Sequence, residues 1–289
     1  MKITYLGPAG ATFSAMAYDK LAFMFDAPKT GDSGTELLLA QSNEEILPLM
    51  LKHGGYGVMA METKAQGRID PPVNSFIELL EAYDERCPVS IVAAIRMRLN
   101  FALMARPGLS VDKVKMILAH KQALGACRKR LETLGAELIE ALSNGQAAED
   151  VATKDDLAYA AALGPSVAAE KYGLVILNGA FEDKEAVTTF FLLSAEGSAS
   201  WTCEENRGLM VFRTKHKPGA LVSVLTPFAR LGINLIHIHS LYSGNGEYDF
   251  AVETECGFTE LGSHLLAGRN AREFMTKHIV FGPFAILDV

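Results

Sequence analysis

Two adjacent threonines, Thr188 and Thr189, lie in the apolar stretch KEAVTTFFLL, which covers residues 184–193. The crowding of Val, Thr, Phe and Leu predicts a buried strand. Neighbouring side chains on a strand point to opposite faces, so one threonine can face a pocket while the other faces packing. The stretch is therefore a candidate wall of a functional site.

Two predicted helix N-termini are candidate anion sites. Ser143, Asn144 and Gly145 open one helix, and Thr12 stands at the start of another. Free backbone N–H groups at a helix N-terminus favour an anion, although Ser and Asn are also common as plain N-caps. His120 fits either a pocket residue or a hydrogen-bonded core residue. No residues with the spacing of a metal-ligand cluster accompany them.

The order of predicted elements indicates an α/β fold followed by a smaller α+β domain. Over residues 1–194 strands and helices alternate, which predicts a mostly parallel sheet. Ser42 with Glu45 three residues later predicts a capping box, in a helix that ends at Gly54. Residues 195–207 are small, polar and acidic and predict a linker. Residues 208–289 predict a ferredoxin-like order of strand, helix, two strands, a helix in ELGSHLLAGRNAREFM and a strand in HIVFGPFAILDV.

Length and composition limit the classes of function. The 289 residues suit two or three domains. A net charge of −7 argues against a general nucleic-acid binder. No run of about 18 apolar residues predicts a membrane span, and MKITYLGPAG lacks the apolar core of a signal peptide. The four cysteines are widely spaced, which suits a reducing cytosol, so we expect a cytoplasmic protein.

Several motifs together resemble the prephenate dehydratase family. They are YLGPAGA, YGVMAMETKAQG, HKQALGACRKRL, AAALGPSVAAEKYGLVIL and VTTFFLL, in the family's order. The resemblance implies two α/β lobes with the active site in the cleft between them, as in a periplasmic-type binding protein. It also implies conversion of prephenate to phenylpyruvate, with loss of water and carbon dioxide and with no metal or organic cofactor.

The resemblance assigns roles to individual residues. Thr188 and Glu62 are the expected catalytic residues, and we add Lys64 as a hypothesis of its own, because it departs from the family motif. Donors are needed for the two carboxylates of prephenate and for its departing hydroxyl. The expected substrate-binding residues are Thr12, Ser14, Thr63, His120, Gln122, Ser143, Asn144, Gly145, Thr189 and Phe190.

The chain lacks a positively charged residue that the family usually has in its cleft. The family usually has Thr-Arg-Phe on the cleft strand, and Thr189 stands in the place of the arginine. A hydroxyl cannot replace a bidentate guanidinium, and a buried carboxylate without its cation costs roughly 3–5 kcal/mol. Lys64, in the place of a family serine, or Lys121, in the place of a proline, is the candidate replacement. The alternative is that both lysines face solvent, as most lysines do.

The C-terminal stretch KPGALVSVLTPFARLGINLIHIHS resembles the ACT regulatory domain. The family binds phenylalanine there at subunit interfaces, so the resemblance also implies a homodimer or homotetramer. A second family motif, Glu-Ser-Arg-Pro, is replaced by residues 239–242, HSLY, and this loss argues against feedback inhibition by phenylalanine. The expected effector-binding residues are Gly219, Ala220, Leu221 and Asn234.

Three functions fit this pattern. The first is a prephenate dehydratase of phenylalanine biosynthesis with a relocated cation. The second is a prephenate decarboxylase of specialised metabolism, which retains the hydroxyl and forms no aromatic ring. The third is a ligand-binding sensor without catalysis. One fold serves all three functions, so the fold does not decide between them. Thr188, Glu62 and the overall match place the dehydratase first, and the intact ACT-like region argues against the decarboxylase. The polar residues of the cleft place the sensor last.

Overall fold

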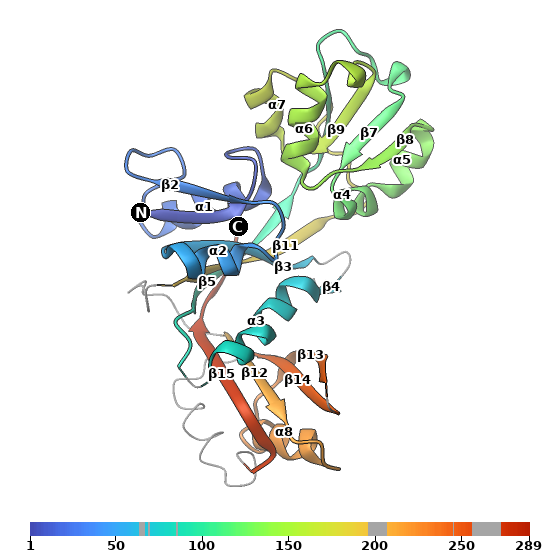
Figure 1. The fold of residues 1–289 in the computed structure, drawn as a ribbon. Helices are drawn as coiled ribbons and strands as arrows, with labels where there is room; N and C mark the ends of the chain where they lie inside the picture. Colours follow the sequence, from blue (N-terminus) through green and yellow to red (C-terminus); the bar gives the residue numbers. More distant parts are fainter. Residues whose placement is uncertain (64–66, 69, 85, 196–206, 245, 256–272) are drawn as a thin grey trace. The chain divides into compact units, whose positions relative to one another are not determined.

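The computed structural model describes residues 1–63, 67–68, 70–84, 86–195, 207–244, 246–255 and 273–289. The chain divides into two compact units (Figure 1). Unit 1 contains Met1–Arg68, Ile95–Phe190 and Val289, and unit 2 contains Ile69–Ala94 and Phe191–Asp288. Most of the expected linker, residues 196–206, lies outside the described residues.

The first lobe of unit 1 is built on parallel strands. β1 pairs with β2 on one side and with β3 on the other, in parallel both times. Parallel strands need crossover connections, and helices supply them here. The elements are β1 (Lys2–Leu6), α1 (Phe13–Met24), β2 (Glu36–Ala40), α2 (Ile46–His53), β3 (Tyr56–Thr63) and the short β4 (Gly67–Arg68), which pairs with β3.

The second lobe of unit 1 holds a five-stranded sheet in the order β10-β6-β9-β7-β8. β7 is parallel to β8 and β9, and β6 is antiparallel to β9 and β10. Its core is rich in alanine, from strands β6 and β9 and from helices α6 and α7. The elements are β6 (Ala102–Ala105), β7 (Met116–Ala119), α4 (Lys121–Ala126), α5 (Arg128–Leu134), β8 (Glu137–Glu140), α6 (Asn144–Thr153), β9 (Ala160–Gly164), α7 (Ser166–Tyr172) and β10 (Val175–Asn178).

The chain passes twice between the two lobes. β5 (Ser90–Leu99) leads out of the first sheet into β6, and the chain returns from β10 into β11 (Ala186–Ser194). β5 and β11 are neighbours in the first sheet, whose order is β16-β5-β11-β3-β1-β2. Residues that follow the carboxyl ends of strands in such sheets line the crevice where ligands bind. These observations confirm the expected α/β class with two lobes.

Unit 2 contains a four-stranded antiparallel sheet in the order β13-β14-β12-β15. This is the ferredoxin-like strand order, as the sequence predicts. Helix α8 packs on the sheet, with Val224 and Phe228 in a buried cluster with Phe212 and Val252. The elements are β12 (Arg207–Thr214), α8 (Ala220–Arg230), β13 (Leu235–Gly244), β14 (Glu247–Thr254), β15 (Met275–Phe284) and β16 (Ile286–Asp288).

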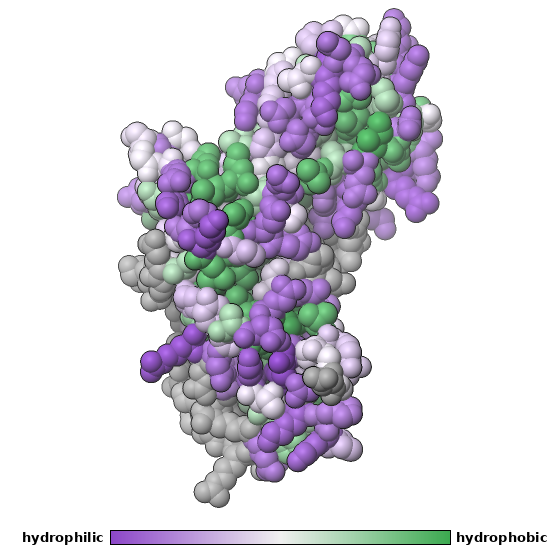
Figure 2. Space-filling view, in the orientation of Figure 1, coloured by the Kyte–Doolittle hydropathy of each residue, from purple (hydrophilic) through white to green (hydrophobic). Residues whose placement is uncertain are grey.

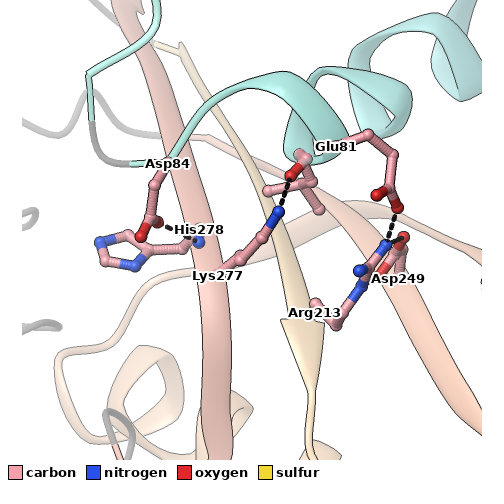
Figure 3. Close-up of polar contacts among 7 residues, drawn as sticks. Glu81, Asp84, Arg213, Asp249, Lys277 and His278 are labelled. Atoms are coloured by element: carbon pink, nitrogen blue, oxygen red, sulfur yellow. Dashed lines mark hydrogen bonds and ion pairs between the residues drawn. The ribbon is translucent and has the colours of Figure 1, made fainter.

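Helix α3 (Asp70–Ala82) belongs to unit 2, although it lies between strands of unit 1 in the sequence. The ring of Phe76 packs edge-on against two other rings, and its centroid lies 5.1 Å from that of Phe281 and 6.4 Å from that of Phe191. Polar contacts extend the packing at the C-terminal end of α3, where Lys277 Nζ donates to the carbonyl oxygen of Leu80 at 2.7 Å (Figure 3). A segment from the middle of the chain thus becomes part of the C-terminal unit.

Some local predictions need correction. Ser42 does not cap α2, because the helix begins at Ile46 with Glu45 as its N-cap. The Glu45 carboxylate instead accepts from the backbone N–H of Gln41 at 2.9 Å. The final strand is two strands, β15 and β16. Most of the helix predicted near residues 260–275 falls in 256–272, outside the described residues.

Hydrophilic residues cover much of the described surface on the face drawn in Figure 2, and hydrophobic residues gather in smaller patches. Buried residues of both lobes and of unit 2 are predominantly aliphatic and aromatic. In the part of the chain that the structure describes, no helix has the length and apolar character needed to cross a membrane.

Candidate active site

A cavity that is partly open to solvent lies within unit 1. Its lining comes from both lobes and from the strands that join them. Strand ends, loops and the first turns of helices supply most of the side chains. The lining residues are Leu6, Thr12, Phe13, Ser14, Asn43, Ala60, Leu99, Phe101, His120, Gln122, Ala123, Ala126, Ser143, Asn144, Ala186, Thr188 and Phe190.

Strand β11 presents alternate residues to the cavity. Ala186, Thr188 and Phe190 line it, and Thr189, which is buried, is not among the lining residues. This is the alternation of a strand. Thr188 is 2% exposed, and its hydroxyl has no hydrogen-bond partner among the described residues. A buried polar group without a partner is uncommon, which makes the Thr188 hydroxyl a candidate ligand-binding group.

The N-terminus of α1 faces the same cavity. Thr12 is its N-cap, and the Thr12 hydroxyl accepts from Ala15 N at 3.2 Å while donating to the Leu6 carbonyl oxygen at 2.9 Å. The Thr12 side chain is therefore occupied in holding the loop. Phe13 and Ser14, in the first turn, also line the cavity. The positive end of this 12-residue helix favours an anion there.

Helix α6 brings a second N-terminus to the cavity. Its N-cap, Ser143, accepts from Gln146 N at 3.0 Å and donates to the Gly7 carbonyl oxygen of the other lobe at 2.6 Å. A Cβ atom at Gly145 would lie 2.7 Å from the Ala11 carbonyl oxygen. Glycine thus allows the first turn of α6 to pack closely on the loop before α1. The two helix N-termini converge on one site.

His120 is held in a defined hydrogen-bonding state. Its backbone N–H donates to Asn144 Oδ1 at 2.9 Å, and its Nδ1 accepts from Gln122 N at 3.4 Å. Burial is the main cause that lowers the pKa of His120, and the nearby charge of Lys121 adds to it. Because Nδ1 is an acceptor, the neutral ring carries its proton on Nε2. His120 is therefore a neutral donor in the cavity wall.

The cavity wall is rich in donors but carries no charged residue among its described lining. Asn144 Oδ1 already accepts a hydrogen bond, which leaves the Asn144 NH₂ group as a donor. Thr188, His120 and two helix N-termini add further donors. The apolar part of the wall includes Phe13 and Phe101, whose rings meet edge-on at 5.2 Å. The arrangement suits a ligand with an apolar ring and anionic groups.

Several lining residues were not predicted from the sequence, chiefly Asn43 and Phe101. Asn43 follows the carboxyl end of β2, which is parallel to β1. The rule that such loops bind ligands was the available signal for Asn43. Phe101 lies in the turn between β5 and β6, and its apolar character gave no comparable signal.

Among the described residues, Glu62 and Gly145 are expected site residues that do not line the cavity. Glu62 is half-buried on β3, two residues after Ala60, so it shares a strand face with a lining residue. Thr63 ends β3, and its side chain is outside the described part, as is Lys64. Gly145 is buried beside the cavity at the start of α6.

The expected effector residues lie in unit 2. Gly219 is the N-cap of α8 with φ of +79°, a conformation that favours glycine. Ala220 begins the helix and is buried, and Leu221 packs against the core cluster of the unit. Asn234 is exposed, and its carbonyl oxygen accepts from Glu255 N at 3.2 Å. Within the described ranges, no group of three or more His, Cys, Asp or Glu side chains could hold a metal ion.

Comparison with known proteins identifies relatives for most of the chain. The family model for prephenate dehydratase matches residues 3–198. The prephenate dehydratase of Corynebacterium glutamicum is 32% identical over 245 residues, which cover 82% of this chain and 72% of that protein. A bifunctional chorismate mutase/prephenate dehydratase of Stutzerimonas stutzeri is 27% identical over 258 residues, 89% of this chain but only 65% of that longer protein.

Solved structures show the same fold. A prephenate dehydratase from Arthrobacter aurescens, solved in complex with L-Phe, matches with a TM-score of 0.76 at 24% identity, over 96% of this chain and 90% of that one. The prephenate dehydratase of Staphylococcus aureus matches with a TM-score of 0.67 at 24% identity, over 98% of this chain and all of that one. The family model covers well over half of the sequence, and the chain therefore belongs to the prephenate dehydratase family.

Proposed function

We propose that this protein is a carbon–oxygen lyase that converts prephenate to phenylpyruvate, with loss of water and carbon dioxide, in phenylalanine biosynthesis. Membership of the prephenate dehydratase family supports the reaction class. The observation that carries the proposal is the Thr188 hydroxyl, which is buried in the cavity wall without a hydrogen-bond partner among the described residues. It offers a donor for the hydroxyl that leaves the ring.

The reaction needs a donor at the leaving oxygen. As carbon dioxide departs, the electrons of the broken C–C bond enter the ring, and the C–O bond breaks to complete the aromatic system. The leaving oxygen takes up one proton and departs as water. A preorganised donor in a site with little water stabilises the charge that develops on this oxygen. In the proposed mechanism the Thr188 hydroxyl is that donor.

The donors at the helix N-termini are proposed to bind the two carboxylates of prephenate. The N-termini of α1 and α6, with Ser14, His120 and Asn144, supply neutral donors for them. The rings of Phe13 and Phe101 provide an apolar surface for the six-membered ring. Gln122 and Phe190 complete the wall of the proposed substrate site.

Glu62 and Lys64 are proposed as further catalytic residues. Glu62 extends the strand face that begins with Ala60 in the cavity wall. Lys64 would supply the positive charge that Thr189 cannot, and this role rests on the sequence alone. Residues 208–289 are proposed to be an ACT domain that assembles a homodimer or homotetramer, in a cytoplasmic protein.

The test is to incubate the purified protein with prephenate and follow the ultraviolet spectrum and the mass of the product. Phenylpyruvate, with its aromatic ring and without the ring hydroxyl, is the expected product. A non-aromatic product that has lost only carbon dioxide would instead make the protein a decarboxylase. Bound but unchanged prephenate would make it a sensor.

A further inference from the structure

Asn43 occupies a fixed position in the cavity wall, at the carboxyl end of β2. Its side-chain Oδ1 accepts from the backbone N–H of Ala60 on β3 at 3.4 Å. Its backbone carbonyl oxygen accepts from Ile46 N, at the first turn of α2, at 3.3 Å. The residue is half-buried, and both Asn43 and Ala60 line the cavity. Contacts with two neighbouring elements thus hold the carboxamide.

The hydrogen bond with Ala60 determines what Asn43 offers to a ligand. A carboxamide has one oxygen, which accepts, and one NH₂ group, which donates twice. Because Ala60 N–H occupies the oxygen, that end is fixed as Oδ1 and the free end is Nδ2. Nδ2 has no hydrogen-bond partner in the described part of the chain. Two donors therefore remain at a residue of the cavity wall.

We infer that Asn43 is a specificity-determining residue that donates a hydrogen bond from Nδ2 to a carboxylate oxygen of the substrate. The inference rests on the proposed function for the identity of that substrate. Asn43 would hold a carboxylate on the β2 side of the cavity, while Thr188 on β11 meets the leaving hydroxyl. A donor that is left unpaired rejects analogues without the matching oxygen. Loss of one hydrogen bond to a charged group corresponds to about 10- to 100-fold in affinity.

Two variants separate this role from a structural one. Asn43→Asp keeps an oxygen that can accept from Ala60 N–H, but it loses both donors and brings a negative charge towards the anionic substrate. Asn43→Leu loses the acceptor as well as the donors at similar volume. A suitable control is Asn178→Leu, because Asn178 also accepts from a backbone N–H, that of Ala180 at 3.1 Å, but is exposed outside the cavity.

The measurements are the KM and kcat for prephenate and the melting temperature of each variant. We expect Asn43→Asp to raise KM at least tenfold with little change in melting temperature. Asn43→Leu should raise KM about tenfold and also lower the melting temperature, and Asn178→Leu should leave KM unchanged. Wild-type KM in Asn43→Asp would overturn the inference, because the role of Asn43 would then be only to accept from Ala60.

The two proposals fail in different ways. If the wild-type protein does not turn over prephenate, the proposed function fails, and Asn43 is then tested by calorimetric titration of prephenate. Tight binding to the wild type and at least tenfold weaker binding to Asn43→Asp would still support the inference. Equal binding to both proteins, or no binding to the wild type, would overturn it.

Discussion

Thr188 combines a cost in stability with a proposed gain in catalysis. A buried hydroxyl without a partner destabilises a fold by about 1–3 kcal/mol. Thr188→Val keeps the shape of the side chain and removes that hydroxyl. We expect the variant to be more stable by about 1 kcal/mol and to lose about 10²- to 10⁴-fold in kcat. Urea denaturation and steady-state kinetics with prephenate measure both effects.

Thr4 provides the matched control for Thr188. It is fully buried on β1, its hydroxyl also lacks a partner among the described residues, and it does not line the cavity. Thr4→Val should therefore stabilise the protein to a similar degree without changing kcat. A Thr188→Val enzyme with normal kcat would contradict the proposed donor role, whatever its stability.

His120 gives a prediction about pH. Burial and Lys121 lower the pKa of His120 more than Glu140 and Glu44 raise it. Below about pH 6.5 the unfolded chain takes up a proton at this residue, while the folded protein resists it. The free energy of unfolding should therefore fall as the pH drops below that value, until His120 is protonated in the folded state too.

His120→Asn tests this linkage. Asparagine can accept from Gln122 N–H as His120 Nδ1 does, but it does not titrate. We expect the free energy of unfolding, measured by urea denaturation, to fall less between pH 7.5 and 5.5 in the variant than in the wild type. An equal decrease in both proteins would show that His120 is protonated equally in the folded and unfolded states.

The individual site residues differ in how well the sequence predicts them. Strand alternation predicted that one of Thr188 and Thr189 faces a pocket, and the family resemblance pointed to Thr188. Thr188 lines the cavity, whereas Thr189, also expected to bind substrate, is not among the lining residues. The position of Asn43 after a strand end was an available signal, but its contact with Ala60 depends on where β3 lies in the sheet. Such a contact requires the tertiary arrangement, which no local pattern contains.

At the scale of elements, a buried ion pair joins β12 and β14 in unit 2 and extends to α3 (Figure 3). The Arg213 guanidinium donates to both carboxylate oxygens of Asp249, at 2.7 and 2.8 Å, and also contacts Glu81. The side chains of Arg213 and Asp249 are only 12% and 4% exposed, whereas Glu81 is 65% exposed. The two carboxylates therefore differ in what they contribute to stability.

Substitution of Arg213 should lower the free energy of unfolding substantially. Arg213→Leu leaves the Asp249 carboxylate buried and unpaired, and we expect a loss of about 3–5 kcal/mol in the free energy of unfolding. Unit 2 should lose its structure first, because the pair lies within its sheet. Chemical denaturation followed by circular dichroism measures the loss.

Glu81→Gln is the control for Arg213→Leu. Hydrogen bonding to Arg213 lowers the pKa of Glu81, yet the side chain is exposed to solvent. An exposed ion pair contributes at most about 1 kcal/mol, so this variant should be nearly as stable as the wild type. A large loss in Glu81→Gln would mean that α3 depends on this contact far more than its exposure indicates.

Element boundaries show the limits of local signals. The sequence predicted the end of α2 at Gly54 correctly but its N-cap wrongly. The Glu45 carboxylate accepts from Gln41 N and does not form a capping box with Ser42. The place of α3 in unit 2 rests on the contacts of Phe76 with β11 and β15. Its amphipathic pattern predicts a buried face but not the partner of that face.

For the whole chain, the order of the predicted elements indicated the correct fold class. Alternating strands and helices indicated an α/β fold, and the family resemblance implied its two lobes. The strand order of unit 2 is the one expected for a ferredoxin-like domain. The two compact units, however, are not continuous stretches of the sequence. Each contains segments from distant parts of the chain, and such long-range partners are set by tertiary packing.

An amino-acid effector needs a carboxylate partner for its ammonium group and donors for its carboxylate. Strand β13 carries neither acidic residues nor Lys or Arg between Leu235 and Gly244. His239, in the place of the family glutamate, pairs its Nε2 with Asn74 Oδ1 of α3 at 2.9 Å. Strand β13 therefore lacks the glutamate and the arginine of the family motif.

We therefore expect millimolar L-phenylalanine to leave kcat/KM for prephenate and the melting temperature unchanged. A ligand that binds only the folded state must raise the melting temperature, so prephenate itself serves as the positive control in the same thermal scan. Inhibition by L-phenylalanine that is not competitive with prephenate would contradict this prediction. It would mean that groups other than the lost glutamate and arginine hold the effector in unit 2, with Gly219 and Asn234 the first positions to substitute.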